Sequence, residues 1–146
     1  MIGPDTPAEL KARALRYLVR REHSRQELAR KLAPHAESPE AVAALLDGLA
    51  ANKQLSDERF AQERARSLSR KFGASKIRHD LRSRGISDEI SARAAADSSD
   101  LETAKKILNR KYREPATTRE ELAKRMRFLQ GRGFSYDVIA KVFKAE

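Results

Sequence analysis

The sequence contains no cysteine and no tryptophan, and aromatic residues make up only 5% of its 146 positions. The lack of cysteine excludes a disulfide framework and a thiolate metal site, and it agrees with a reducing compartment. The scarcity of aromatic side chains argues against binding of single-stranded nucleic acid by base stacking on aromatic rings. The composition favours helices with narrow apolar stripes over a sandwich with a thick core.

Long hydrophobic runs are also absent. No apolar stretch approaches the roughly 18 residues that a membrane span needs. The first ten residues, MIGPDTPAEL, lack the basic segment and following apolar segment of a signal peptide. We therefore expect a cytoplasmic protein without a membrane partner.

Sequence motifs for chemistry are missing as well. There is no GxxxxGK[ST] loop to hold a phosphate, and the acidic residues are scattered without a paired-carboxylate pattern. His23, His35 and His79 have no metal-ligand spacing, and we expect each to lie at the surface or beside a helix cap. These absences favour a binding protein over an enzyme, with no cofactor, metal or small-molecule substrate.

What the sequence does contain is positive charge. It has 31 basic and 21 acidic residues, a net charge of +10. Net charge rises along the chain, from +2 in residues 1–55 to +3 in 56–97 and +5 in 98–146. A protein this basic usually meets nucleic acid, an acidic protein or an anionic membrane, and the second half is the better candidate surface.

Helix starts are the clearest local signal, because a Ser or Thr hydroxyl satisfies the free N–H groups of a first turn. The candidates are Thr6, Ser24, Ser38, Ser56, Ser75, Ser87, Ser99, Thr118 and Ser135. Four of them have Glu three residues later, which predicts full capping boxes at Thr6, Ser24, Ser99 and Thr118. We expect helices near 7–21, 25–34, 39–53, 57–72, 75–84, 88–97, 100–113, 119–131 and 136–144, and no β-sheet.

These helices fall into three sets of three with a period near 48 residues. Leu32, Leu81 and Leu129 mark the middle helices, and a shared L-x-x-R-G-apolar-S sequence links the middle helix to the third helix in the second and third sets. Its glycine is suited to the left-handed residue that ends a helix. The pattern predicts an all-α protein of tandem three-helix repeats, 1–55, 56–97 and 98–146, which form an elongated, curved body.

Basic residues gather around the second repeat. Residues 64–84 hold eight basic residues and one acid, Asp80. A helical projection places Arg59, Arg66 and Arg70 opposite the apolar stripe of helix 57–72. A solvated face is the ordinary explanation of any single arginine, but three aligned ones favour a contact surface. The candidate contact residues are Arg59, Arg66, Arg70, Lys76, Arg78, Arg82, Lys124, Arg127 and Arg132.

The apolar pattern of the third repeat is less regular. It places Leu122 and Met126 in the core. Phe128 falls on another side, which predicts packing against an adjacent repeat or, as the alternative, an exposed anchor for a partner. We expect Tyr112 and Tyr136 to lie at the core edge with their hydroxyls in water.

Several of these segments resemble one known family. Residues 17–32, YLVRREHSRQELARKL, resemble the Y-L-x-x-R-x-x-S-x-x-E-L-x-x-K-L opening of the RecX family of bacterial recombination regulators. Residues 55–61, LSDERFA, and residues 73–86, GASKIRHDLRSRGI, resemble its acidic R-(F/Y)-A segment and its G-x-x-x-I-x-x-x-L-x-x-(K/R)-G-(I/V) corner.

The resemblance implies tandem three-helix repeats and binding to the RecA recombinase, along the groove of the RecA–DNA filament. It further implies inhibition of the RecA ATPase, co-protease and strand-exchange activities and control of the SOS response. It brings no catalytic residues. The matched positions are caps, glycine corners and core leucines, so the contact residues rest on charge alone.

Two other functions stay open from the sequence. A sequence-independent DNA-binding protein would hold single- or double-stranded DNA through its phosphates, with strong salt dependence. An enzyme such as a nuclease is the third possibility, but the sequence shows no carboxylate cluster for a metal.

Overall fold

A computed structural model of the chain describes residues 3–96 and 99–144, and within them it contains nine α-helices and one short 3₁₀ helix but no strand. The first set is α1 (Pro7–Arg20), α2 (Arg25–Leu32), η1 (Ala33–His35) and α3 (Pro39–Ala51). The second set is α4 (Asp57–Leu68), α5 (Ala74–Ser83) and α6 (Asp88–Ala96). The third set is α7 (Asp100–Lys111), α8 (Arg119–Gly131) and α9 (Tyr136–Lys144). The all-α prediction is confirmed.

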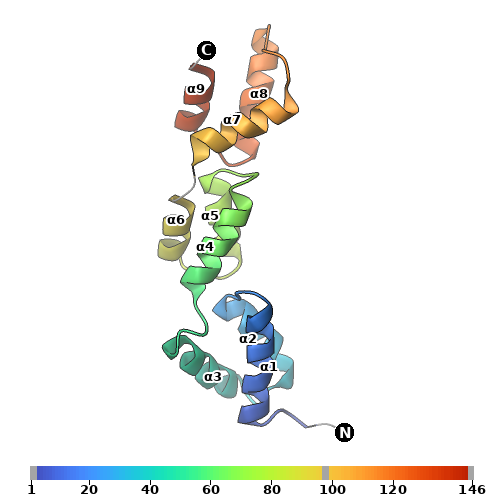
Figure 1. Cartoon of the computed structure of the whole chain (residues 1–146), viewed down its shortest axis with the longest axis vertical. Helices are drawn as coiled ribbons and strands as arrows, with labels where there is room; N and C mark the ends of the chain where they lie inside the picture. Colours follow the sequence, from blue (N-terminus) through green and yellow to red (C-terminus); the bar gives the residue numbers. More distant parts are fainter. Residues whose placement is uncertain (1–2, 97–98, 145–146) are drawn as a thin grey trace.

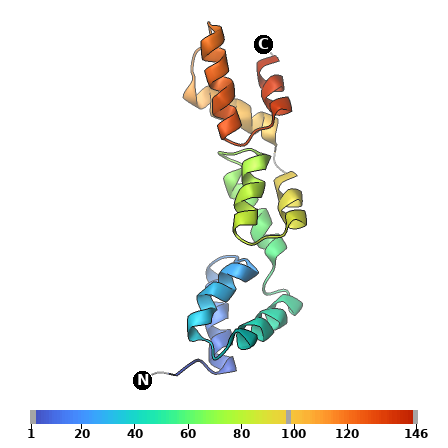
Figure 2. The ribbon, with the colours of Figure 1, turned by 180° about the vertical axis from the view of Figure 1, so that it is seen from behind.

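The three sets stack along the long axis of the molecule, with the two termini at opposite ends (Figure 1). The first helices, α1, α4 and α7, lie on the side nearer the viewer in Figure 1. The middle helices, α2, α5 and α8, follow one another on the opposite side (Figure 2). The predicted elongated array of three-helix repeats is confirmed.

Each set has its own hydrophobic core, because its helices bury their apolar stripes against one another. The first core includes Leu28, Leu32 and Leu46, the second Phe60, Ile77 and Leu81, and the third Ile107, Leu129 and Ile139. Leu32, Leu81 and Leu129, the residues that revealed the period, are all fully buried. Of the described residues, none joins two of these cores, so the joints between sets depend on polar contacts.

Most predicted helix caps are confirmed. A side-chain oxygen accepts the N–H three residues on at Thr6, Ser24, Ser38, Ser56, Ser87, Thr118 and Ser135. A complete capping box forms at Thr6, where the Glu9 carboxylate also accepts the Thr6 N–H at 3.0 Å. The boxes predicted at Ser24 and Thr118 are wrong. Glu27 turns to Arg21 and Glu121 to the N–H of Thr117 instead.

Two predicted caps are wrong. Ser99 precedes α7, but its side chain makes no capping hydrogen bond. Ser75 lies inside α5, which begins at Ala74 with Gly73 as its cap residue. The preceding helix also ends earlier than expected, at Leu68 rather than near residue 72.

The start of α5 needs no side-chain cap of its own because the third repeat supplies the acceptors. Gly73 N–H donates to the carbonyl of Arg132 at 2.8 Å, and Ser75 N–H donates to that of Gly133 at 3.2 Å. These carbonyls follow the end of α8, so the free N–H groups of one helix meet the free C=O groups of another. The aligned helix dipoles favour this end-to-end contact.

An aspartate at the start of each following repeat completes this arrangement. Asp100 accepts the Ala74 N–H at 2.9 Å, and Asp57 accepts the Arg25 N–H at 2.7 Å. In both joints the aspartate is the first residue of the first helix of one repeat, and its carboxylate caps the middle helix of the preceding repeat. This recurring contact ties neighbouring repeats together.

The predicted glycine corners are confirmed. Gly85 and Gly133 have φ values of +86° and +92°, in the left-handed region that disfavours other residues. The corner at Gly133 packs directly on the backbone of Lys76. The corner therefore ends its own helix and also permits close contact with the preceding repeat.

Several side-chain predictions for the third repeat are wrong. Leu122 is 37% exposed and Tyr136 is 77% exposed, so neither contributes to the core as expected. Phe128 is half-buried within its own repeat, where its ring meets Tyr112 edge to face with centroids 6.0 Å apart. The apolar pattern gave wrong positions because α8 begins three residues earlier relative to its core leucine, Leu129, than α5 does relative to Leu81.

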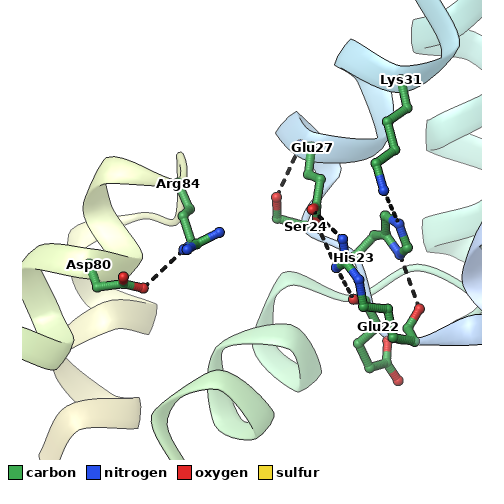
Figure 3. A network of polar contacts seen from close by, with 8 residues as sticks. Glu22, His23, Ser24, Glu27, Lys31, Asp80 and Arg84 are labelled. Atoms are coloured by element: carbon green, nitrogen blue, oxygen red, sulfur yellow. Dashed lines mark hydrogen bonds and ion pairs between the residues drawn. The ribbon is translucent and has the colours of Figure 1, made fainter. Parts of the chain in front are cut away.

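His23 flanks the cap Ser24 as expected, but its surface position is wrong, since it is only 1% exposed. Its Nδ1–H donates to the Arg21 carbonyl at 3.0 Å, and Nε2 accepts from the Lys31 ammonium at 2.9 Å (Figure 3). Burial lowers the pKa of His23, which keeps the ring neutral and able to accept that hydrogen bond.

No helix among the described residues combines the length and the apolar character that crossing a membrane requires.

Candidate partner-binding surface

The predicted contact residues divide between two sides of the array. Arg59 and Arg66 lie on α4 and Arg70 in the turn after it, on the side of the first helices. The others belong to α5, α8 or the end of α8, on the side of the middle helices (Figure 2). These are Lys76, Arg78, Arg82, Lys124, Arg127 and Arg132. The nine residues are therefore distributed over two sides of the array, and their role as contact residues stays a prediction.

Two of the predicted residues already have acidic partners. Arg59 pairs with Glu22 of the first repeat at 2.8 Å, and Arg82 pairs with Asp88 at 2.6 Å. Both pairs are substantially exposed, so each contributes little to stability. A partner would nevertheless have to compete with these carboxylates.

Lys76 and Arg132 take part in the joint between the second and third repeats. The Lys76 ammonium donates to the Gly131 carbonyl at 3.2 Å, and Arg132 donates to the Lys71 carbonyl at 3.2 Å. Both cations also lie over the ring of Phe72. Their first role is to hold two repeats together.

The remaining predicted cations have exposed side chains and, among the described residues, no acidic partner within ion-pair distance. They are Arg66, Arg70, Arg78, Lys124 and Arg127. Three of these, Arg78, Lys124 and Arg127, lie on α5 and α8. We call these three residues the column cations, because α5 and α8 meet end to end.

The absence of ion pairs extends over the whole third repeat. Eight arginines form ion pairs in the first two repeats, whereas no Lys or Arg in residues 101–144 lies within 4.0 Å of a described carboxylate oxygen. That segment carries twelve basic residues. Its positive charge is therefore not neutralised by local pairing and remains available to an anionic partner.

Several of these cations are instead held on aromatic rings. Arg132 lies 5.1 Å from the centroid of Phe128, and Lys111 lies 4.3 Å from the same ring. Arg125 lies 4.4 Å from the Tyr112 centroid. A ring orders a cation without cancelling its charge. We call these residues the cation–aromatic strip. The sequence does not single out Lys111 and Arg125, because nothing in their spacing shows that α7 and α8 bring them to neighbouring aromatic rings.

The cleft between the first and second repeats has a different electrostatic character. It has a volume of about 360 Å³ and is lined by Arg21, Glu27, Arg64 and Arg84 among others. The hydrogen bond from Arg21 lowers the pKa of Glu27 and outweighs the opposing effect of burial. This cleft holds charges of both signs, so it is not a continuation of the basic surface.

Asp80 lies beside this cleft on α5 (Figure 3). Burial raises the pKa of Asp80, but hydrogen bonds from Arg64 and Arg84 outweigh it, so the pKa lies below its usual value. The only acid within residues 64–84 is therefore ionised, and it neutralises part of the basic stretch from within. Arg64 and Arg84 are consequently poor candidates for partner contacts.

The described part of the chain contains no group of three or more His, Cys, Asp or Glu residues that could hold a metal ion. The three separate cores and the polar joints define a class of protein, a modular all-α repeat protein.

The chain belongs to the RecX family. Family models for the first, second and third three-helix domains of RecX match residues 11–49, 56–94 and 98–143. Regulatory protein RecX of Herbaspirillum seropedicae is 43% identical over 97% of this chain and 93% of that protein. Regulatory protein RecX of Ralstonia nicotianae is 40% identical over 99% of this chain and 92% of that protein. The suspected family is thus confirmed.

Solved structures share the same fold. The crystal structure of RecX from Lactobacillus salivarius superposes with a TM-score of 0.85 over 95% of each chain, at 22% sequence identity. A second crystal structure of regulatory protein RecX gives a TM-score of 0.76 at 26% identity, over 95% of this chain and 75% of that chain. The exact repeat boundaries stay a prediction, and the one between residues 97 and 98 lies outside the described residues.

Proposed function

We propose that this protein is a cytoplasmic regulator that binds the RecA–DNA filament and inhibits the ATPase, co-protease and strand-exchange activities of RecA. In this role it modulates recombinational repair and the SOS response. It acts as a binding protein rather than an enzyme. The relatives' name, regulatory protein RecX, supports a regulatory role of this kind.

The observation that carries the proposal is the unpaired positive charge along α5 and the third repeat. An elongated array can contact several subunits of a filament, and many weak contacts then add up to firm binding. The column cations and the cation–aromatic strip supply such contacts for acidic protein surface. No deep pocket is needed.

The test is inhibition of DNA-dependent ATP hydrolysis by RecA. We expect the triple variant Arg78→Glu, Lys124→Glu, Arg127→Glu to need at least tenfold more protein for half-inhibition. A matched control reverses Lys11, Arg20 and Lys53, exposed cations of the first repeat that form no ion pair with a described residue, and should inhibit like the unmodified protein. Equal inhibition by both folded variants would show that the column cations are not the contact surface.

Direct DNA binding is the second candidate function, and the cation–aromatic strip favours it. Ordered cations beside aromatic rings suit a phosphate backbone. The discriminating measurement is DNA affinity without recombinase at about 50 and 200 mM salt, where binding through many phosphates falls by orders of magnitude. Tight, salt-sensitive binding at the inhibitory concentration would favour this candidate, whereas negligible binding would favour recognition of the recombinase itself.

A further inference from the structure

The two joints of the array are built differently, although both join a glycine corner to the start of a middle helix. In the joint between the second and third repeats, backbone packs on backbone. A Cβ on Gly73 would lie 2.5 Å from the Gly133 carbonyl oxygen, and a Cβ on Gly133 would lie 2.7 Å from the Lys76 nitrogen. Such close backbone contact leaves little room for the two repeats to rotate.

Hydrogen bonds reinforce this second joint. Two backbone–backbone bonds cross it, from Gly73 to Arg132 and from Ser75 to Gly133. The Arg132 guanidinium is also held between the rings of Phe72 and Phe128, which belong to different repeats. Rotation of the third repeat would break all of these contacts together.

The joint between the first and second repeats has no such framework. No backbone–backbone hydrogen bond crosses it within the described residues. The atoms nearest to a Cβ built on Gly85 all belong to the Gln26 side chain, from its amide oxygen back to its Cβ, rather than to backbone. The direct polar links are the Glu22–Arg59 ion pair at 2.8 Å and the Asp57 carboxylate on the Arg25 N–H.

A cleft lies beside each joint, with a volume of about 360 Å³ at the first and about 340 Å³ at the second, so open space does not distinguish them. Asp80 of α5 and Arg84 at its C-cap lie opposite Ser24, the N-cap of α2, and Glu27 of α2 (Figure 3). Arg84 and Glu27 both line the cleft of about 360 Å³. No hydrogen bond or ion pair between described residues links these two sets of side chains. Within the described residues, tilting of the first repeat would therefore break the two direct polar links but no backbone–backbone hydrogen bond.

From this difference between the joints we propose that the protein consists of two bodies that move relative to each other. The second and third repeats form one rigid body, and the first repeat pivots on it, held by an ionic latch made of Glu22 and Arg59. Since the latch is a partly exposed ion pair, salt screens it and widens the range of the pivot. On a helical partner, a use that rests on the proposed function, the two bodies could settle on separate subunits.

The absence of native cysteine makes the test direct, because introduced cysteines are the only sites for spin labels. One double variant carries Val19→Cys and Glu89→Cys, one on each side of the first joint. Another carries Glu89→Cys and Tyr136→Cys, one on each side of the second joint. All three positions are strongly exposed. Pulsed electron–electron double resonance then gives the distribution of distances between the two spin labels across each joint, in the absence of any partner.

We expect the distribution across the first joint to be at least twice as broad as that across the second. It should broaden further in about 1 M salt, where screening acts within roughly 3 Å. Equal widths for the two joints, or the same salt response in both, would overturn the proposal. This outcome is independent of recombinase binding, so the proposed function can stand or fall separately.

A variant tests the latch itself. Glu22→Gln with Arg59→Gln should broaden only the distribution across the first joint, even at low salt. The matched control is Glu58→Gln with Arg93→Gln, which removes a 2.8 Å ion pair inside the second repeat. If the latch variant changes the distribution no more than this control does, Glu22 and Arg59 do not restrain the pivot.

Discussion

The joint between the second and third repeats allows a sharp prediction with two neighbouring glycines. In Gly133→Ala, the new methyl would lie 2.5 Å from the Lys76 Cβ, and the residue would have to keep a φ of +92°. The left-handed conformation alone costs about 1–2 kcal/mol for a residue with a side chain. If the joint separates instead, its two backbone hydrogen bonds are lost, at about 1 kcal/mol each.

We therefore expect Gly133→Ala to lower the free energy of unfolding by about 2–4 kcal/mol. Gly131→Ala is the matched control, because no atom lies within 4 Å of its added methyl. As a replacement at the end of α8, it should be neutral or raise stability by about 0.5–1 kcal/mol.

Urea unfolding followed by helical circular dichroism measures both variants. The account of the joint is refuted if Gly133→Ala is as stable as the unmodified protein. It is equally refuted if Gly131→Ala loses as much stability, since that loss could not come from the joint.

Three further comparisons test single features of the fold. Burial lowers the pKa of His23 in the folded protein, so the contribution of this residue to stability is fully present above about pH 6.5 and is lost as the pH falls below that value. Between pH 7 and pH 5, the free energy of unfolding of the unmodified protein should therefore fall more than that of the His23→Gln variant. Leu81→Ala should lower the free energy of unfolding by about 2–5 kcal/mol and Leu122→Ala by much less, because Leu81 is fully buried and Leu122 is not. Similar losses in the two variants would contradict the core assignment. Thr6→Ala should cost about 1 kcal/mol and Ser99→Ala almost nothing, since only Thr6 caps its helix; thermal unfolding of the two variants decides.

The sequence was sufficient for the fold because its signals are local. Ser and Thr caps act within a turn, and a left-handed glycine ends the helix that precedes it. Gly85 and Gly133 could thus be placed at helix ends from the sequence alone. Core leucines such as Leu81 follow from helical periodicity in the same way.

Contacts between repeats could not be predicted in this way. Ser75 looked like a cap, but α5 receives its acceptors from Arg132 and Gly133, more than fifty residues away. Arg59 looked unpaired, but its partner Glu22 lies in another repeat. A helical projection also cannot tell that α4 and α5 present their exposed faces to opposite sides. The sequence therefore could not show which cations are paired across repeats or on which side of the array each one lies, and which of them contact a partner stays a prediction.

The central claim is that the column cations hold the protein on the RecA–DNA filament. The most direct test is the affinity of fluorescently labelled protein for preformed filaments, compared with monomeric recombinase. We predict that the unmodified protein and the Lys11, Arg20, Lys53 reversal bind filaments alike, and that reversal of Arg78, Lys124 and Arg127 weakens binding at least tenfold. Unchanged filament affinity in that folded column variant would contradict the account.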